Sequence, residues 1–142
     1  MTNSPATAPA WTDLGPTWPN HESSRFLEAG GLRWHVQVSG TGPDLLLLHG
    51  TGSATHSWAR LLPQLATRFR VIAPDLPGHG FPAAPSRESL TLPGMATGVA
   101  HLLEVLGASP GLVVGHSAGA AVLLQMNPVD GRVQRVRHLL PG

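Results

Sequence analysis

The stretch Leu112-Val-Val-Gly-His-Ser-Ala-Gly-Ala120 decides the fold of this chain of 142 residues. It contains the pattern Gly-x-Ser-x-Gly, in which Gly115 and Gly119 stand two residues before and after Ser117. This pattern is typical of a sharp turn between a strand and a helix that presents a reactive serine at the end of a sheet. Glycines at these positions keep side chains away from the crowded turn. We therefore interpret Ser117 as a catalytic nucleophile, with Gly115, His116 and Gly119 as the frame of its turn.

Short apolar runs alternate with amphipathic segments along the chain. This order predicts an α/β fold with a mostly parallel sheet and flanking helices. The pair Gly30-Gly31 lies between two runs of alternating polarity and predicts an N-terminal β-hairpin. The second of these runs is expected to bury only one face. The predicted strands are 25–29, 32–39, 45–48, 70–73 and 112–114, and the predicted helices are 58–66, 95–106 and 118–126.

The loop His49-Gly-Thr-Gly52 follows a predicted buried strand. In a sheet of this kind, a backbone N–H of this loop and the N–H that follows the serine together bind the oxyanion that develops in acyl transfer. The candidate donors are the amides of Thr51 and Ala118, with Gly50 as an alternative to Thr51. We expect His49 to fix the loop rather than to act as a base.

A second loop, Asp75-Leu-Pro-Gly-His-Gly80, follows the next predicted strand. Asp75 could orient a histidine, but we expect it to accept hydrogen bonds from loop amides, as Asx side chains do in turns. Residues 78–83 also match a dinucleotide-binding pattern, Gly-x-Gly-x-x-Ala. Pro82 and Pro85 disfavour the helix start that this pattern requires, so we do not predict a nucleotide site.

Composition excludes several kinds of chemistry. The chain has no Cys, Lys or Tyr, which rules out a thiolate nucleophile, a lysine Schiff base and a Walker A loop. Its eight histidines are scattered without the spacing of metal ligands, so we expect neither a metal nor a cofactor. A net charge of +1 does not indicate the basic surface that nucleic-acid binding requires. No apolar run approaches the ~18 residues of a membrane span. We therefore expect a cytoplasmic protein.

The order of these motifs resembles the first half of an α/β-hydrolase over residues 24–126. Seven longer stretches carry a more specific resemblance. They are Gly15-Pro-Thr-Trp-Pro-Asn20, Ser24-Arg-Phe26, Ala29-Gly-Gly-Leu-Arg-Trp-His35, His49-Gly-Thr-Gly52, Thr55-His-Ser-Trp58, Leu92-Pro-Gly-Met95 and Val114-Gly-His-Ser-Ala-Gly-Ala120. They resemble one branch of that superfamily, the magnesium-chelatase accessory proteins of bacteriochlorophyll synthesis. The resemblance implies hydrolysis of a small ester or acyl substrate beside the enzyme that inserts magnesium into protoporphyrin, with chelatase subunits as partners.

The chain departs from this family pattern after residue 126. The family places an acid and then a histidine on later strands, after the serine. Asp130 and His138 are the acidic residue and the histidine that follow Ser117, and we do not assign them these roles because no further strand–helix unit carries them. We therefore expect an incomplete α/β-hydrolase fold that is truncated and not catalytically competent alone. The expected parts are an extended arm (1–20), the N-terminal half of a hydrolase domain (21–126) and an atypical tail (127–142).

Two consequences follow from this division of the chain. The strand 112–114 would be an exposed sheet edge through which the chain self-associates. The arm carries Trp11 and Trp18, which we expect to pack on the body or on a partner.

Two other functions stay open beside the serine-hydrolase prediction. One is a non-catalytic accessory protein that binds a tetrapyrrole or a chelatase subunit through its pocket or its arm. The other is a degraded gene product without a function.

Overall fold

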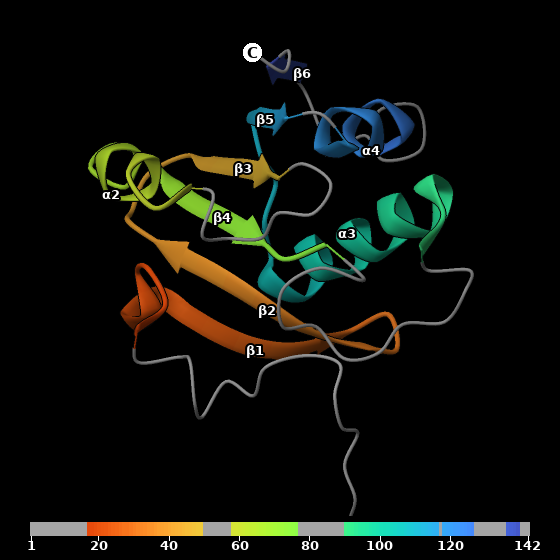
Figure 1. The fold of residues 1–142 in the computed structure, drawn as a ribbon, viewed down its shortest axis with the longest axis horizontal. Helices are drawn as coiled ribbons and strands as arrows, with labels where there is room; N and C mark the ends of the chain where they lie inside the picture. The colour runs from red at the N-terminus through yellow and green to blue at the C-terminus, as the bar shows by residue number, and fades with distance from the viewer. Residues whose placement is uncertain (1–16, 50–57, 77–89, 117, 127–135, 140–142) are drawn as a thin grey trace, which may run out of the picture.

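The computed structural model describes residues 17–49, 58–76, 90–116, 118–126 and 136–139. The strands are β1 (Ser24–Ala29), β2 (Leu32–Ser39), β3 (Asp44–Leu48), β4 (Arg70–Pro74), β5 (Leu112–His116) and β6 (Val136–Leu139). They form one sheet in the order β1-β2-β4-β3-β5-β6 (Figure 1). Strands β4, β3, β5 and β6 run parallel, whereas β2 pairs antiparallel with both β1 and β4. The predicted α/β fold with a mostly parallel sheet is confirmed.

The N-terminal hairpin forms where the sequence predicts it. Ser24 pairs with Gln37 at one end of the hairpin and Ala29 pairs with Leu32 at the other. The two-residue turn between the strands has φ angles of 61° and 80°, which side chains other than glycine rarely adopt. Two positive φ values in succession give a turn whose twist matches the twist of the strands. A 3₁₀ turn, η2 (His21–Ser23), precedes the hairpin.

Helices cover both faces of the sheet. Helices α3 (Leu92–Leu106) and α4 (Ala118–Met126) pack on one face, and α2 (Leu61–Leu65) packs on the other (Figure 1). Leu46 and Leu48 of β3 enter the core with α3 and α4, while Leu45 and Leu47 enter the core with α2. All four side chains are fully buried, as expected for a strand in the interior of a parallel sheet.

Two helices differ in length from the prediction. Helix α3 begins at Leu92 because Thr91 caps it by accepting a hydrogen bond from the N–H of Gly94 at 3.0 Å. It ends at the predicted cap, Gly107, whose φ is 63°. Helix α2 spans five residues and starts so that Pro63 falls in its first turn, where a missing N–H disrupts no helical hydrogen bond. None of the helices in the described segments is long and apolar enough to cross a membrane.

The expected exposed edge at β5 is wrong. Strand β6 lies beside β5 in parallel, with Val113 opposite Val136 and Gly115 opposite His138. Part of the segment interpreted as an atypical tail therefore continues the sheet. Self-association through an uncovered β5 is therefore not expected, because β5 is paired with β3 on one side and with β6 on the other.

Asp44 joins the start of β3 to two neighbouring segments. Its carboxylate accepts hydrogen bonds from Arg70 Nε at 2.6 Å, from Arg70 Nη2 at 3.1 Å and from the N–H of Ser109 at 2.9 Å. The hydrogen bond from Arg70 is the main reason why the pKa of Asp44 lies below its ordinary value. The ionised carboxylate therefore contributes to the stability of the fold.

We expect Asp44→Asn to lower the free energy of unfolding at neutral pH by about 1.5 kcal/mol. Because the folded-state pKa is depressed, this contribution is complete above the unfolded-state pKa of about 3.9 and is lost as the pH falls through the folded-state pKa. Urea unfolding at neutral pH and at about pH 3 measures the free energy of unfolding of the unmodified chain and of Asp44→Asn. The difference between these two free energies should be smaller at the acid pH. Glu104→Gln, at an exposed position, is the control. A difference that does not change with pH would contradict the assignment.

Candidate active site

The two glycines that frame Ser117 stand where a side chain does not fit. A Cβ atom on Gly115 would lie 2.8 Å from the backbone of Ala120, in the first turn of α4. A Cβ atom on Gly119 would overlap the carbonyl oxygen of Leu48 and lie 2.6 Å from that of His49. Both contacts are closer than real Cβ atoms show. The chain thus turns sharply from β5 into α4, as the predicted nucleophile turn requires.

The same contacts bring the end of β3 against this turn. Leu48 and Gly115 are paired in the parallel ladder of β3 and β5. Gly119 packs on the carbonyl groups of Leu48, the last residue of β3, and of His49, the residue after it. Ser117, Thr51 and Gly50 lie outside the described residues, and Ala118 is the first residue of α4. The nucleophile and the oxyanion amides therefore stay predictions, although the segments on either side of them meet.

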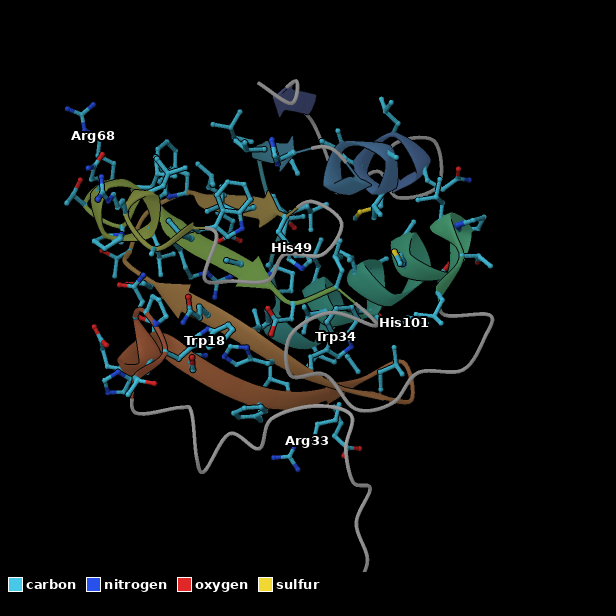
Figure 2. The ribbon with its side chains drawn as sticks, viewed as in Figure 1. Trp18, Arg33, Trp34, His49, Arg68 and His101 are labelled. Carbon is cyan, nitrogen blue, oxygen red and sulfur yellow. The ribbon has the colours of Figure 1, made fainter. Side chains whose placement is uncertain are left out.

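His49 links the loops that follow β3 and β4. Its ring is fully buried, and its Nε2 accepts a hydrogen bond from the N–H of Leu76 at 2.9 Å. The Nε2 atom must therefore be unprotonated, so that a neutral ring carries its proton on Nδ1. Figure 2 shows His49 at the carboxyl end of β3. In this position its side chain joins the residue after β3 to Leu76, two residues after β4.

The carboxylate of Asp75 contacts a histidine, in addition to any hydrogen bonds that it accepts from loop amides. Its Oδ2 lies 2.7 Å from Nδ1 of His35 in β2, and both side chains are fully buried. The Nε2 atom of the same ring lies 2.8 Å from the hydroxyl of Ser24 at the start of β1. Three polar side chains from β1, β2 and the end of β4 thus form one hydrogen-bonded chain.

Ser24 and His35 are not among the predicted site residues, because the alternating pattern of β2 predicts that only one face is buried. Residues 34–38 are instead all buried. The antiparallel pairing of Val36 with Pro74 brings Asp75 beside the other face of β2. The available signal is Asp75 itself, since a carboxylate at the end of a strand could orient a histidine. The sequence did not indicate which histidine.

Residues 18–20 of the N-terminal arm lie beside His35 and its neighbour in β2, Gln37. The ring of Phe26 stacks on the ring of His35 with 5.1 Å between the ring centroids. The ring of Trp18 meets the His35 ring edge-on, with 6.2 Å between the centroids. The side-chain amide of Gln37 donates to the carbonyl oxygens of Pro19 at 2.7 Å and Asn20 at 3.1 Å. Trp18 therefore packs on the body as expected, beside the strands of the hairpin (Figure 2), whereas Trp11 lies outside the described residues.

An apolar cavity of about 280 Å³ lies at the other end of α4, between α4 and α3. Its lining includes His101 of α3, and Gln125 and Met126 of α4. The predicted nucleophile precedes the first residue of α4, so this cavity is not the site that the sequence predicts. The candidate active site lies instead at the carboxyl ends of β4, β3 and β5, where Asp75, His49 and Gly115 are found.

Comparison with known proteins agrees with this geometry. A model of the alpha/beta hydrolase family matches residues 45–140. The magnesium-chelatase 30 kDa subunit of Rhodobacter capsulatus is 41% identical over 125 residues, which are 87% of this chain and 44% of that protein.

Solved structures share the same fold. Cfl2 of Burkholderia cenocepacia is 31% identical with a TM-score of 0.77, over 82% of this chain and 40% of that one. An epoxide hydrolase of Vigna radiata is 29% identical with a TM-score of 0.74, over 82% of this chain and 38% of that one. This chain therefore spans less than half the length of each of these relatives.

Proposed function

The chain belongs to the α/β-hydrolase family, and from this premise we propose that it is a cytoplasmic serine-hydrolase-type protein of the magnesium-chelatase accessory branch. Its substrate would be a small ester or acyl compound, and its partners would be chelatase subunits. Ser117 would be the nucleophile. The amides of Ala118 and Thr51, or Gly50 in place of Thr51, would bind the oxyanion.

The observation that carries this proposal is the packing of Gly119 on the carbonyl groups of Leu48 and His49. Acyl transfer needs a nucleophile and two converging N–H donors around one carbonyl oxygen. The residue that follows the serine begins α4, and the loop that follows His49 starts from the same contact. A nucleophile turn that touches the start of this loop supports such convergence. Loss of one donor of this kind typically costs about 3 kcal/mol of transition-state stabilisation.

A second observation supports weak activity of this chain alone. A serine hydroxyl is a poor nucleophile unless a base accepts its proton. Asp130 and the side chain of His138 lie outside what the structure describes, although the backbone of His138 is opposite Gly115. This chain covers 44% of the chelatase subunit from Rhodobacter. We propose that an acid and a base of a longer hydrolase domain complete the site.

We therefore expect this chain to hydrolyse p-nitrophenyl esters far below the 1–10³ s⁻¹ that is typical of enzymes. A residual rate can persist, because oxyanion binding alone gives slight catalysis. The measurement is steady-state release of nitrophenol by this chain, by its Ser117→Ala variant and by a full-length relative. Turnover by this chain at rates typical of enzymes, abolished in Ser117→Ala, would contradict the proposal that it is incomplete.

A non-catalytic accessory function is the second candidate. It is favoured by one finding: the relative that aligns with 87% of this chain is named as a chelatase subunit. Binding assays with purified magnesium-chelatase subunits and with protoporphyrin separate the two functions. An accessory protein keeps its affinity and its effect on magnesium insertion in Ser117→Ala, whereas a hydrolase of the same branch loses activity.

A further inference from the structure

We propose that Ser24 is a second nucleophile, activated by His35 and Asp75, which accepts one acyl group from a small activated ester. The proposal rests on the hydrogen-bonded chain that joins β1, β2 and the end of β4. It concerns a serine far from residues 115–119 in sequence, so it does not depend on the function proposed for Ser117.

The connectivity of the three groups is that of a nucleophile, a base and an orienting acid. A carboxylate can only accept hydrogen bonds, so Nδ1 of His35 donates its proton to Oδ2 of Asp75 over 2.7 Å. In the neutral ring, Nε2 then has a free lone pair. That atom lies 2.8 Å from the hydroxyl oxygen of Ser24 and can take its proton. This arrangement of Ser, His and Asp activates serine in unrelated folds, where geometry rather than chain position identifies it.

Burial differs along the chain of three groups in the way that catalysis requires. His35 and Asp75 are fully buried, which excludes water from the base and from the acid. Ser24 is half-buried and begins β1, the strand at the edge of the sheet. A small ester can therefore approach the hydroxyl from solvent while the base behind it stays shielded. The stacked ring of Phe26 further restricts His35 to one orientation.

The environment of the hydroxyl also predicts where the reaction stops. The side-chain amide of Gln37 donates to the Ser24 oxygen at 3.2 Å, and its donors are shared with two backbone carbonyl groups. This contact fixes the hydroxyl so that its own proton points to His35. A hydroxyl oxygen that already accepts a hydrogen bond is also a weaker nucleophile. We therefore expect slow acylation without rapid turnover.

The chemical step balances without a further reactant. The Ser24 oxygen forms a bond to the carbonyl carbon of p-nitrophenyl acetate while its proton moves to Nε2 of His35. The bond between that carbon and the nitrophenolate oxygen then breaks. The leaving group takes the proton, so one ester and one serine give one acetylserine and one nitrophenol.

The test is acetylation of the whole chain by p-nitrophenyl acetate, with each modified residue assigned by fragment-ion mass spectrometry. We expect acetyl groups on Ser24 and not on the neighbouring Ser23. The rate of Ser24 acetylation should be at least about 10²-fold higher in the folded chain than in urea, the gain that general-base catalysis provides. Ser24→Ala should remove this modification. Ser23→Ala is the matched control and should retain it, as should Ser117→Ala.

Two results would overturn the proposal. One is a folded chain in which Ser24 reacts no faster than it does in urea. The other is a His35→Gln variant that keeps a cooperative thermal transition and acetylates Ser24 at the unchanged rate. If His35→Gln does not fold, the rates of Ser24 acetylation in the native chain and in the same chain in urea still test the proposal. Modification of Ser117 alone is a case of the first result, and it would support the function proposed above.

Discussion

A chain with alanine in place of Gly119 will be strongly destabilised, by about 3 kcal/mol or more. Glycine to alanine within a helix normally stabilises by up to about 1 kcal/mol, because alanine has the higher helix propensity. At this position the new methyl group would overlap the carbonyl oxygen of Leu48 and press on that of His49. These are backbone atoms of a fully buried strand and cannot move as a flexible side chain would. The substitution is therefore expected to destabilise the fold, whereas helix propensity alone would predict that it stabilises the fold.

Gly111→Ala is the matched control for this prediction. Gly111 precedes β5, and a Cβ atom there would meet nothing within 4 Å. We expect its free energy of unfolding to stay within about 1 kcal/mol of the unmodified chain. Urea denaturation followed by circular dichroism gives both values. If the two variants are equally stable, Gly119 does not pack against the end of β3, and the main support for the nucleophile turn is lost.

The sequence pattern around Ser117 predicted this region well because its constraints are local. Strand β5, helix α4 and the two glycines all lie within 15 residues, from Leu112 to Met126. The sterics of one tight turn decide the residue types there. The buried strand β3 was predicted for a similar reason, since only a strand covered on both faces tolerates four consecutive leucines, Leu45 to Leu48.

Strand β6 could not be predicted in this way. It has only four residues, Arg132 and Arg135 precede it, and Arg137 lies within it. Such a composition favours a loop when it is considered alone. The strand forms by backbone pairing with β5, and its side chains give little signal of that pairing. Local pattern therefore failed where a distant partner decides the structure.

The chain from Ser24 to Asp75 was missed for a related reason. His35 and Asp75 are 40 residues apart and meet only because β2 pairs with β4 rather than with β3. The alternation along β2 placed His35 and Gln37 on a solvent face. In the structure the loop start after β4 and the N-terminal arm cover that face, so two polar side chains enter the interior with partners. A neighbour in space, rather than in sequence, decides their burial.

Asp75→Ala is expected to lower the free energy of unfolding by about 3 kcal/mol, the upper end of the usual cost of leaving a buried hydrogen-bond donor without its acceptor. His35 would keep a buried Nδ1–H group without this acceptor, beside the space left by the carboxylate. His35→Ala and the double variant complete a cycle that separates the cost of the contact from the cost of the cavities. We expect a coupling energy of about 1–3 kcal/mol.

Glu28→Ala, at an exposed position of β1, is the control, and its free energy of unfolding should stay within about 0.5 kcal/mol of that of the unmodified chain. A coupling energy of zero would mean that the contact does not hold β2 to the end of β4, and it would also remove the oriented base from the proposal for Ser24.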